Sequence, residues 1–270
     1  MIRKVRITDS KNLPLRYARD LESFKNGKEY EFKPGINIIV GNNGCGKTTL
    51  IKIIASYMLC ENKMCTELPN FSVFGDSLKI ANLFIGEELK DGMKVESDYA
   101  GVVYNYITHK DLTNDEILSS AEKAIMYMDN SSASTGESMV SSLGYLFNMA
   151  FSNKNIQFPI NEIIELSKKS NDIWSKRFKS LLKYYKENSM QVSREDFEFT
   201  FLLDEPDRNL DLDNIDSIYN ILSYRKENTQ LLCVIHNPIL IYKLSKLPYI
   251  NFVEMTDGYV DKVNGVFSKL

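Results

Sequence analysis

The sequence predicts an α/β fold with a mostly parallel central sheet, N-terminal antiparallel strands and an inserted α-helical subdomain. Two features lead to this prediction. Strand and helix patterns alternate at both ends of the chain, and a block of helical patterns separates these ends. In addition, a glycine-rich loop lies between an apolar strand and an apolar-periodic helix, as it does in βα units.

The first part of the chain is dominated by strand patterns. Residues 2–8 alternate between charged and apolar side chains, and the turn Pro34-Gly35 introduces a run of apolar residues. We expect strands at 2–8, 29–32, 36–40 and 100–107, and a helix from about Lys47 to Leu59.

The rest of the chain begins with helices and then returns to alternation. A capping-box pattern, Thr113-Asn-Asp-Glu116, opens the first helix of the block. We expect helices at 113–128, 138–151, within 160–187, at 212–226 and after Pro238, strands at 199–203 and 230–235, and a strand pair near 250–263. This order predicts three parts: an N-terminal lobe at 1–110, a helical subdomain at 111–196 and the C-terminal part of the core at 197–270.

Composition excludes some classes of protein. The chain has 270 residues, of which 43% are hydrophobic, and this is enough to bury a full core. Its net charge of -3 excludes a basic field over the whole molecule, although a local patch for nucleic acid stays possible. We find no run of about 18 apolar residues that would span a membrane and no apolar N-terminal run of a signal peptide, so we expect a cytoplasmic protein. Cys60 and Cys65 are interpreted as buried thiols or, alternatively, as metal ligands.

The glycine-rich loop carries the most specific motif. Gly41-Asn-Asn-Gly44-Cys-Gly46-Lys47-Thr48 matches G-x-x-x-x-G-K-[ST] in full. Glycines let the backbone point successive N–H groups at phosphate oxygens, and the following helix directs its positive end at the same charge. Lys47 is expected to reach the β- and γ-phosphates, and the Thr48 hydroxyl to bind Mg²⁺. The predicted nucleotide-binding residues here are Asn42, Asn43, Gly44, Cys45, Gly46, Lys47, Thr48 and Thr49.

A second candidate region follows the apolar strand at 199–203. The strand ends in Asp204-Glu205-Pro206. A carboxylate at the carboxyl end of a strand can hold the Mg²⁺ water shell, and we assign this to Asp204. Glu205 would then act as general base toward the attacking water.

These residues resemble the ABC ATPase superfamily. The run Glu205-Pro-Asp-Arg-Asn-Leu-Asp211 is similar to the family pattern E-P-x-x-x-L-D, and His236 follows the next apolar strand. The resemblance implies that Asp211 communicates across a dimer and that His236 contacts the γ-phosphate. It also implies that Ala133-Ser134-Thr135-Gly136-Glu137 is a divergent signature motif, in which Ser134 and Gly136 grip nucleotide bound to a second copy. An ordinary helix N-cap is the alternative reading of this segment.

The expected fold is therefore a P-loop NTPase of the ABC ATPase head type, with ATP and Mg²⁺ as cofactors and Lys47, Glu205 and His236 as catalytic residues. Because each signature completes the site of the other subunit, the resemblance implies a homodimer that closes around ATP. The entry to the loop resembles the SMC/RecF-like branch and small ATPases of bacterial repair and anti-phage operons.

The sequence departs from the family pattern in two places. The expected glutamine between the loop and the signature is missing, and Glu87, Glu88 or Asn105 are possible replacements. The span from Gly136 to Asp204, 204 − 136 = 68 residues, is long. It contains a basic, aromatic helical block at 160–188, for which three interpretations stay open. The block is a solvent-exposed helix face with its apolar side in the core, a protein-binding surface or a surface that binds a nucleic-acid backbone.

Our functional hypothesis is an ATP-hydrolysing ABC-type ATPase that regulates a separate effector, such as a nuclease or toxin, in DNA repair or anti-phage defence. Two alternatives stay open. One is the nucleotide-binding subunit of a membrane transporter, and the other is a structural switch that binds ATP without hydrolysing it.

Overall fold

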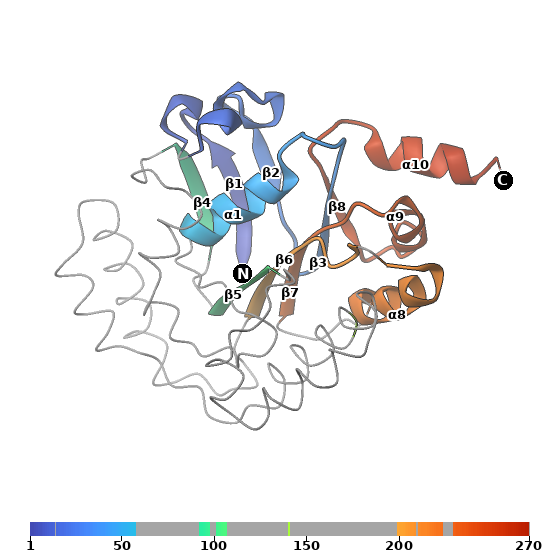
Figure 1. Cartoon of the computed structure of the whole chain (residues 1–270). Coiled ribbons are helices and arrows are strands. Elements are labelled where there is room, and N and C mark those ends of the chain that lie inside the picture. Colours follow the sequence, from blue (N-terminus) through green and yellow to red (C-terminus); the bar gives the residue numbers. More distant parts are fainter. Residues whose placement is uncertain are drawn as a thin grey trace, which may run out of the picture.

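The computed structural model describes residues 1–13, 15–57, 92–97, 101–106, 140, 199–208, 210–223 and 229–269. Within these residues, two sheets and four helices of seven residues or more form the fold (Figure 1). The helices are α1 (Lys47–Tyr57), α8 (Leu212–Ser223), α9 (Pro238–Leu244) and α10 (Tyr259–Phe267).

The smaller sheet is antiparallel and contains the N-terminus. Strand β1 (Ile2–Ile7) lies between β2 (Glu29–Glu31) and β4 (Met93–Ser97). The apolar side chains of β1 are buried and its charged side chains lie outside, as the alternation in the sequence predicts. This sheet therefore has one apolar face, which must pack against another layer.

The larger sheet consists of parallel strands. Its order is β5 (Gly101–Tyr106), β6 (Phe199–Asp204), β7 (Thr229–Val234), β3 (Gly35–Val40) and β8 (Asn251–Glu254). All neighbouring strands in this order run parallel, so their carboxyl ends meet at one edge of the sheet. The loop after β3 and the acidic turn after β6 both begin at that edge.

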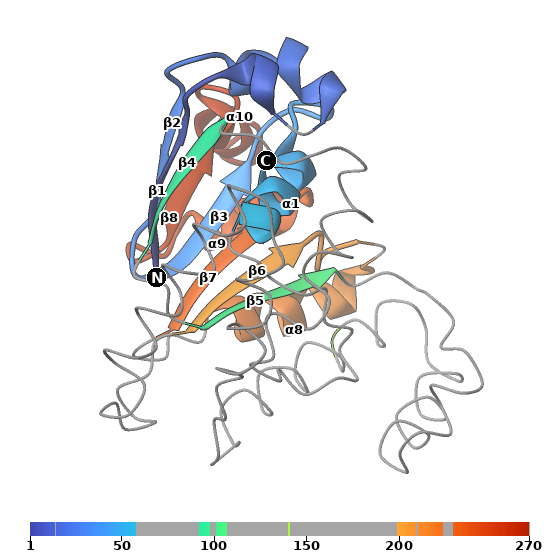
Figure 2. The ribbon, with the colours of Figure 1, turned by 90° about the vertical axis from the view of Figure 1, so that its left-hand side faces the viewer.

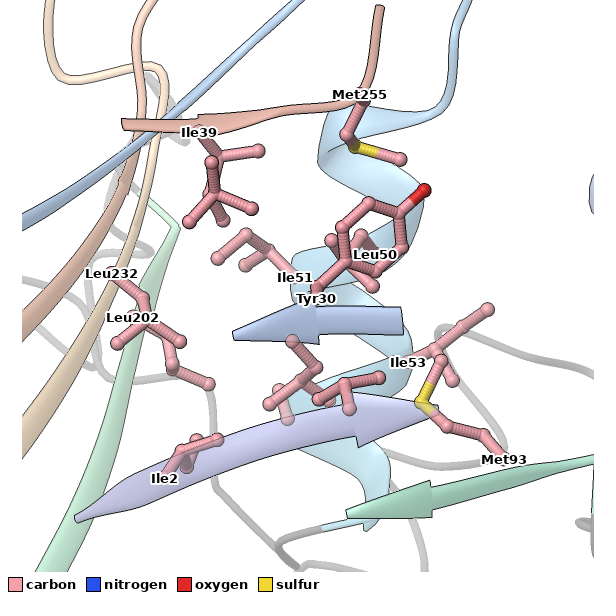
Figure 3. Packing of buried hydrophobic residues seen from close by; sticks show 14 of the residues in the cluster. Ile2, Tyr30, Ile39, Leu50, Ile51, Ile53, Met93, Leu202, Leu232 and Met255 are labelled. Atoms are coloured by element: carbon pink, nitrogen blue, oxygen red, sulfur yellow. The ribbon is translucent and has the colours of Figure 1, made fainter. Parts of the chain in front are cut away.

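The two faces of the parallel sheet are covered by different layers. Helix α1 and the antiparallel sheet cover one face, and α8, α9 and α10 lie on the other (Figure 2). Neighbouring residues on one strand point to opposite faces, since Leu202 packs with the first layer and Leu203 with the second. Figure 3 shows the first layer, in which Ile51 of α1, Ile2 of β1 and Leu232 of β7 share one cluster.

A buried glutamine joins the two sheets. The side-chain amide of Gln230 on β7 donates to the carbonyls of Ile2 at 2.7 Å and Lys33 at 2.9 Å. Its oxygen accepts from the backbone N–H of Ile2 and from the Thr200 hydroxyl. All of its hydrogen-bonding capacity is thus used inside the protein, which makes Gln230 a structural residue.

Most of the expected elements are confirmed within a few residues of their predicted ends. The strand pair expected near 250–263 is wrong in its second half, because residues 259–267 form α10. The apolar side chains there recur at helical spacing, and Phe267 stacks on Tyr242 of α9 with ring centroids 5.0 Å apart.

Several features were not predicted, and others lie outside the described residues. Strand β4 was missed, and so were three short 3₁₀ helices, η1 (Ser10–Asn12), η2 (Arg16–Asp20) and η3 (Glu22–Phe24), in a region expected to contain strands only. The expected helices at 113–128 and 160–187 lie outside the described residues, as does the 138–151 helix apart from Val140, which is helical. The division into three parts stays a prediction.

Candidate nucleotide-binding site

The phosphate-loop motif occupies the turn between β3 and α1. Gly44 and Gly46 have φ angles of 79° and 96°, which lie in the region that favours glycine. These angles let the backbone reverse and enter α1 at Lys47. The loop residues Asn42, Asn43 and Gly44 are exposed, whereas Lys47 and Thr49 are buried. The loop thus presents backbone to solvent at the amino end of a helix, where an anion binds favourably.

Lys47 lies beneath the loop and is only 3% exposed. Its Nζ donates to the carbonyl oxygens of Gly41 at 2.8 Å and Asn42 at 3.0 Å. Burial lowers the pKa of this ammonium group, and nearby groups that include Glu205 and Asp204 oppose the shift. The lysine is therefore held close to the positions that loop-bound phosphates would take.

The short helices near the N-terminus brace the loop. The Ser23 hydroxyl donates to the carbonyl of Cys45 at 2.5 Å. Tyr17 shares a hydrogen bond of 2.9 Å with the Thr49 hydroxyl. A Cβ added to Gly46 would lie 2.6 Å from Cε2 of the buried Phe24. Sequence reasoning missed this brace, because η2 and η3 carry no motif and meet the loop only through the fold.

The acidic turn after β6 meets the phosphate loop at the edge of the sheet. Thr48 donates its hydroxyl proton to Oδ1 of Asp204 at 3.0 Å, and Oε1 of Glu205 lies 3.4 Å from the same hydroxyl. These residues are far apart in the sequence, and the parallel order of β3, β7 and β6 brings them together. The predicted Mg²⁺ residues Thr48 and Asp204 are therefore direct neighbours.

The donor set around Asp204 fits a hard divalent cation. Its Oδ2 atom is buried and has no hydrogen-bond partner among the residues that the structure describes. Burial raises the pKa of Asp204 to about 6, because the charged form has lost its hydration. In the described part of the chain, no cluster of three His, Cys, Asp or Glu side chains could hold a metal ion unaided. Mg²⁺ commonly needs one or two protein oxygens besides substrate phosphates and water, and the neighbouring oxygens of Thr48 and Asp204 fit this need.

The raised pKa of Asp204 leads to a stability prediction. We expect Asp204→Asn to stabilise the nucleotide-free, metal-free chain by about 1–3 kcal/mol at pH 8, measured by urea unfolding. The folded pKa of about 6 exceeds the ordinary value of 3.8, so the native state keeps the proton longer than the unfolded chain. The wild type is thus stabilised below the unfolded pKa and loses that stability as the pH rises through about 6. The gain from Asn should therefore be smaller at pH 5, and a gain that is the same at both pH values would contradict this origin.

Glu205 adopts an unusual backbone conformation. Its φ angle is +54°, and no other non-glycine residue in the described part has a positive φ. Such a conformation costs about 1–3 kcal/mol and persists only where the surroundings enforce it. Here the turn is closed by the Arg208 N–H, which donates to the Glu205 carbonyl at 3.1 Å. In this conformation the side chain of Glu205 lies between Thr48 and His236.

His236 completes the group at the edge of the sheet. It follows β7, and its Nε2 lies 3.2 Å from Oε1 of Glu205. Burial lowers the pKa of the imidazole, and the charge of Lys47 lowers it further. A neutral imidazole is therefore favoured at pH 7. Its buried Nε2 atom makes no hydrogen bond within the described residues, so it can still pair with an atom of a ligand.

The remaining predicted residues are placed differently. Asp211 is exposed at the start of α8, where its side chain accepts from the Asn214 N–H at 2.9 Å and caps the helix. Ser134 and Gly136 lie outside the described residues, as do Glu87, Glu88, Cys60 and Cys65. Asn105 is on β5, opposite Leu203 in the register. Apart from this cap by Asp211, no role for these residues follows from the described part of the structure.

This arrangement defines a class of protein. A phosphate loop between a parallel strand and a helix, with an acidic residue at the end of a neighbouring strand, characterises a P-loop NTPase. The chain belongs to the AAA_23 family of AAA domains, whose profile matches residues 19–233.

Among solved structures, the ADP conformation of an ATP-binding cassette of an ABC transporter matches at 16% sequence identity and a TM-score of 0.40. The match covers 99% of this chain and 95% of that one. No curated protein sequence matches the chain. The described helices include none that is long and apolar enough to cross a bilayer.

Proposed function

We propose that this chain binds ATP with Mg²⁺ and hydrolyses it. The observation that carries the proposal is the position of Glu205, whose carboxylate lies 3.4 Å from the Thr48 hydroxyl and 3.2 Å from the His236 imidazole. Both of these neighbours belong to the same edge as the phosphate loop. A carboxylate beside the γ-phosphate position is suited to act on a water molecule.

Binding would depend on the phosphate loop. Its backbone N–H groups and the amino end of α1 would hold the phosphate oxygens. When ATP binds, the Lys47 ammonium would give up its hydrogen bonds to the loop carbonyls and donate to β- and γ-phosphate oxygens instead. Thr48 and Asp204 would hold Mg²⁺, which, when bound, neutralises charge on the phosphates.

Hydrolysis would need a proton acceptor and a stabilised leaving group. Glu205 would accept a proton from water as the water oxygen bonds to the γ-phosphorus and the bond to the β-γ bridging oxygen breaks. His236 would hold the Glu205 carboxylate in place or donate to a γ-phosphate oxygen. Lys47 would stabilise the charge that moves toward the β-phosphate. The products are ADP and inorganic phosphate.

We also propose that two copies close around ATP. Ser134 and Gly136 would then contact the nucleotide held by the Lys47 of the other copy, and Asp211 would lie at the contact between copies. Support comes from the resemblance of these motifs to the ABC ATPase pattern and from the exposed position of Asp211, next to Leu212, which is 73% exposed. The closed pair would regulate a separate effector, such as a nuclease or toxin, in repair or anti-phage defence. A neighbouring gene for such an effector would favour this role, and a neighbouring permease gene would favour transport.

Lys47→Ala tests the binding step. We expect the affinity for ATP to fall by about 100-fold or more, because hydrogen bonds from a charged group contribute about 1.5–3 kcal/mol each. Isothermal titration with ATP in the presence of Mg²⁺ measures this. Lys94→Ala is the matched control, since Lys94 lies on β4 with 66% of its side chain exposed. Equal affinities for both variants would refute the assigned role of the loop.

A further inference from the structure

The turn after Glu205 contains a buried carboxylate that the proposed chemistry does not use. Asp207 is only 5% exposed and follows directly after Glu205-Pro206 in the turn that leaves β6. Burying a charged side chain costs stability unless specific partners satisfy it. The contacts of Asp207 therefore show what this carboxylate does in the fold.

Asp207 bonds to the backbone on the next strand of the sheet. Its Oδ2 accepts the N–H of His236 at 2.7 Å and also the N–H of Asn237. These two N–H groups follow β7, and Asp207 follows β6, which pairs with β7 up to Asp204 and Val234. The carboxylate thus bridges two chain segments where the strand pairing ends.

Other hydrogen bonds hold both ends of the segment 235–237, which contains His236. Before it, the Ile235 N–H donates to the Ile39 carbonyl at 3.3 Å. After it, the Asn237 side chain accepts from the N–H of Ile239 at 2.9 Å and caps α9, with Pro238 at the first turn. Between these supports, only Asp207 contacts the backbone N–H of His236 among the described residues. Asp207 is therefore the acceptor that holds the backbone of His236 itself, between the two supports on either side.

We propose that Asp207 is a positioning residue that holds the His236 backbone so that the imidazole stays beside the Glu205 carboxylate. The inference rests on the proposed function, because the placement matters for turnover only if Glu205 and His236 act on ATP. In this proposal Asp207 acts only by placing His236 and does not contact the substrate.

Two substitutions separate the hydrogen bonds from the charge. Asp207→Ala removes the acceptor and leaves two N–H groups without their partner. Asp207→Asn keeps an amide oxygen of the same reach, which can accept from both N–H groups. Asp216→Ala is the matched control, because Asp216 is an exposed carboxylate on α8 that pairs with Lys243 of α9.

The kinetic test compares these variants with and without His236. We expect Asp207→Ala to lower kcat for ATP hydrolysis by about 10–100-fold, as expected for loss of a correctly placed catalytic group. Asp216→Ala should leave kcat within about twofold of the wild type. ATP affinity of Asp207→Ala should change by less than about threefold, and Asp207→Asn should restore kcat to within about threefold of the wild type. In the His236→Ala background, adding Asp207→Ala should change kcat by less than about twofold, since residues that act as a unit are not additive.

A second readout does not depend on activity. The chain has two histidines, His109 and His236, so imidazole NMR signals can be assigned with the His236→Ala variant. Asp207→Ala should shift the His236 signals and leave those of His109 in place, and Asp207→Asn should keep both. Amide exchange at His236 and Asn237 should also become faster in the alanine variant.

The outcomes separate the two proposals. Unshifted His236 signals in Asp207→Ala, or an equal loss of kcat with and without His236, would overturn the positioning role. If the wild type did not hydrolyse ATP, the proposed function would fail, and the NMR signals would still decide whether Asp207 places the imidazole. If the alanine variant did not fold, Asp207→Glu would replace it, because its longer side chain moves the acceptor and should give the same shift and loss.

Discussion

Glu205→Gln is expected to lower kcat for ATP hydrolysis by about 10²–10⁴-fold while the affinity for ATP stays within about threefold of the wild type. The amide has the shape of the carboxylate but cannot accept the proton of the attacking water. Its oxygen can keep the contacts with Thr48 and His236, at 3.4 and 3.2 Å in the wild type. The residues assigned to phosphate and metal binding are unchanged.

The same variant tests assembly. If two copies close around ATP, blocked hydrolysis should trap the closed dimer, so Glu205→Gln should elute as a dimer with ATP and as a monomer with ADP. Glu96→Gln is the control, because Glu96 lies on β4 with half of its side chain exposed. Unchanged turnover in Glu205→Gln would disprove the role of general base. Lost turnover without an ATP-dependent dimer would disprove only the proposed assembly.

Gly46→Ala is expected to destabilise the chain by about 2–6 kcal/mol and to weaken ATP binding at least tenfold. Its φ angle of +96° is strained for any residue with a Cβ. The new Cβ would also lie 2.6 Å from the Phe24 ring and 2.9 Å from Cδ1 of Leu21, so the loop or its brace must move. Displaced loop N–H groups then bind phosphate less well.

Gly44→Ala is the matched control for stability. Gly44 has a similar φ of +79°, but a Cβ there meets nothing within 4 Å. Gly44→Ala should therefore lower the free energy of unfolding only by the backbone strain, about 1–2 kcal/mol. Chemical denaturation measures both variants, and titration with ATP measures binding by Gly46→Ala. Equal destabilisation by the two variants would show that packing of η3 against the loop contributes nothing.

Local patterns account for the elements that were predicted. The charged and apolar alternation of β1, the apolar runs of β3, β6 and β7, and the helical spacing in α8 depend on a few neighbouring residues. The failure at 259–267 has a local cause as well, because its apolar residues fit a helix better than the strand that was expected. Strand β4 alternates apolar and charged residues but is only five residues long, and it was not recognised without its partner β1.

The residues of the candidate site also fall into two groups, those found from the sequence and those found only in the structure. The loop motif and the carboxylates Asp204 and Glu205 were found from residue types and spacing, whereas Asp211 and His236 were found from the resemblance to the ABC ATPase pattern. Ser23, Phe24 and Asp207 escaped notice, since a serine, a phenylalanine and a turn aspartate are common and carry no motif. Their roles appear only in their contacts with Cys45, Gly46 and His236.

The chemistry expected of the phosphate loop and of the acidic strand end was inferred from the order of residues alone, because it depends on side-chain identity within short segments. The meeting of Thr48, Asp204, Glu205 and His236 at one edge became known from the folded chain, as did the support from Asp207 and the N-terminal 3₁₀ helices. The physical reason is that strand order and close packing are settled by burial of the whole apolar surface, to which residues far apart in the chain contribute together.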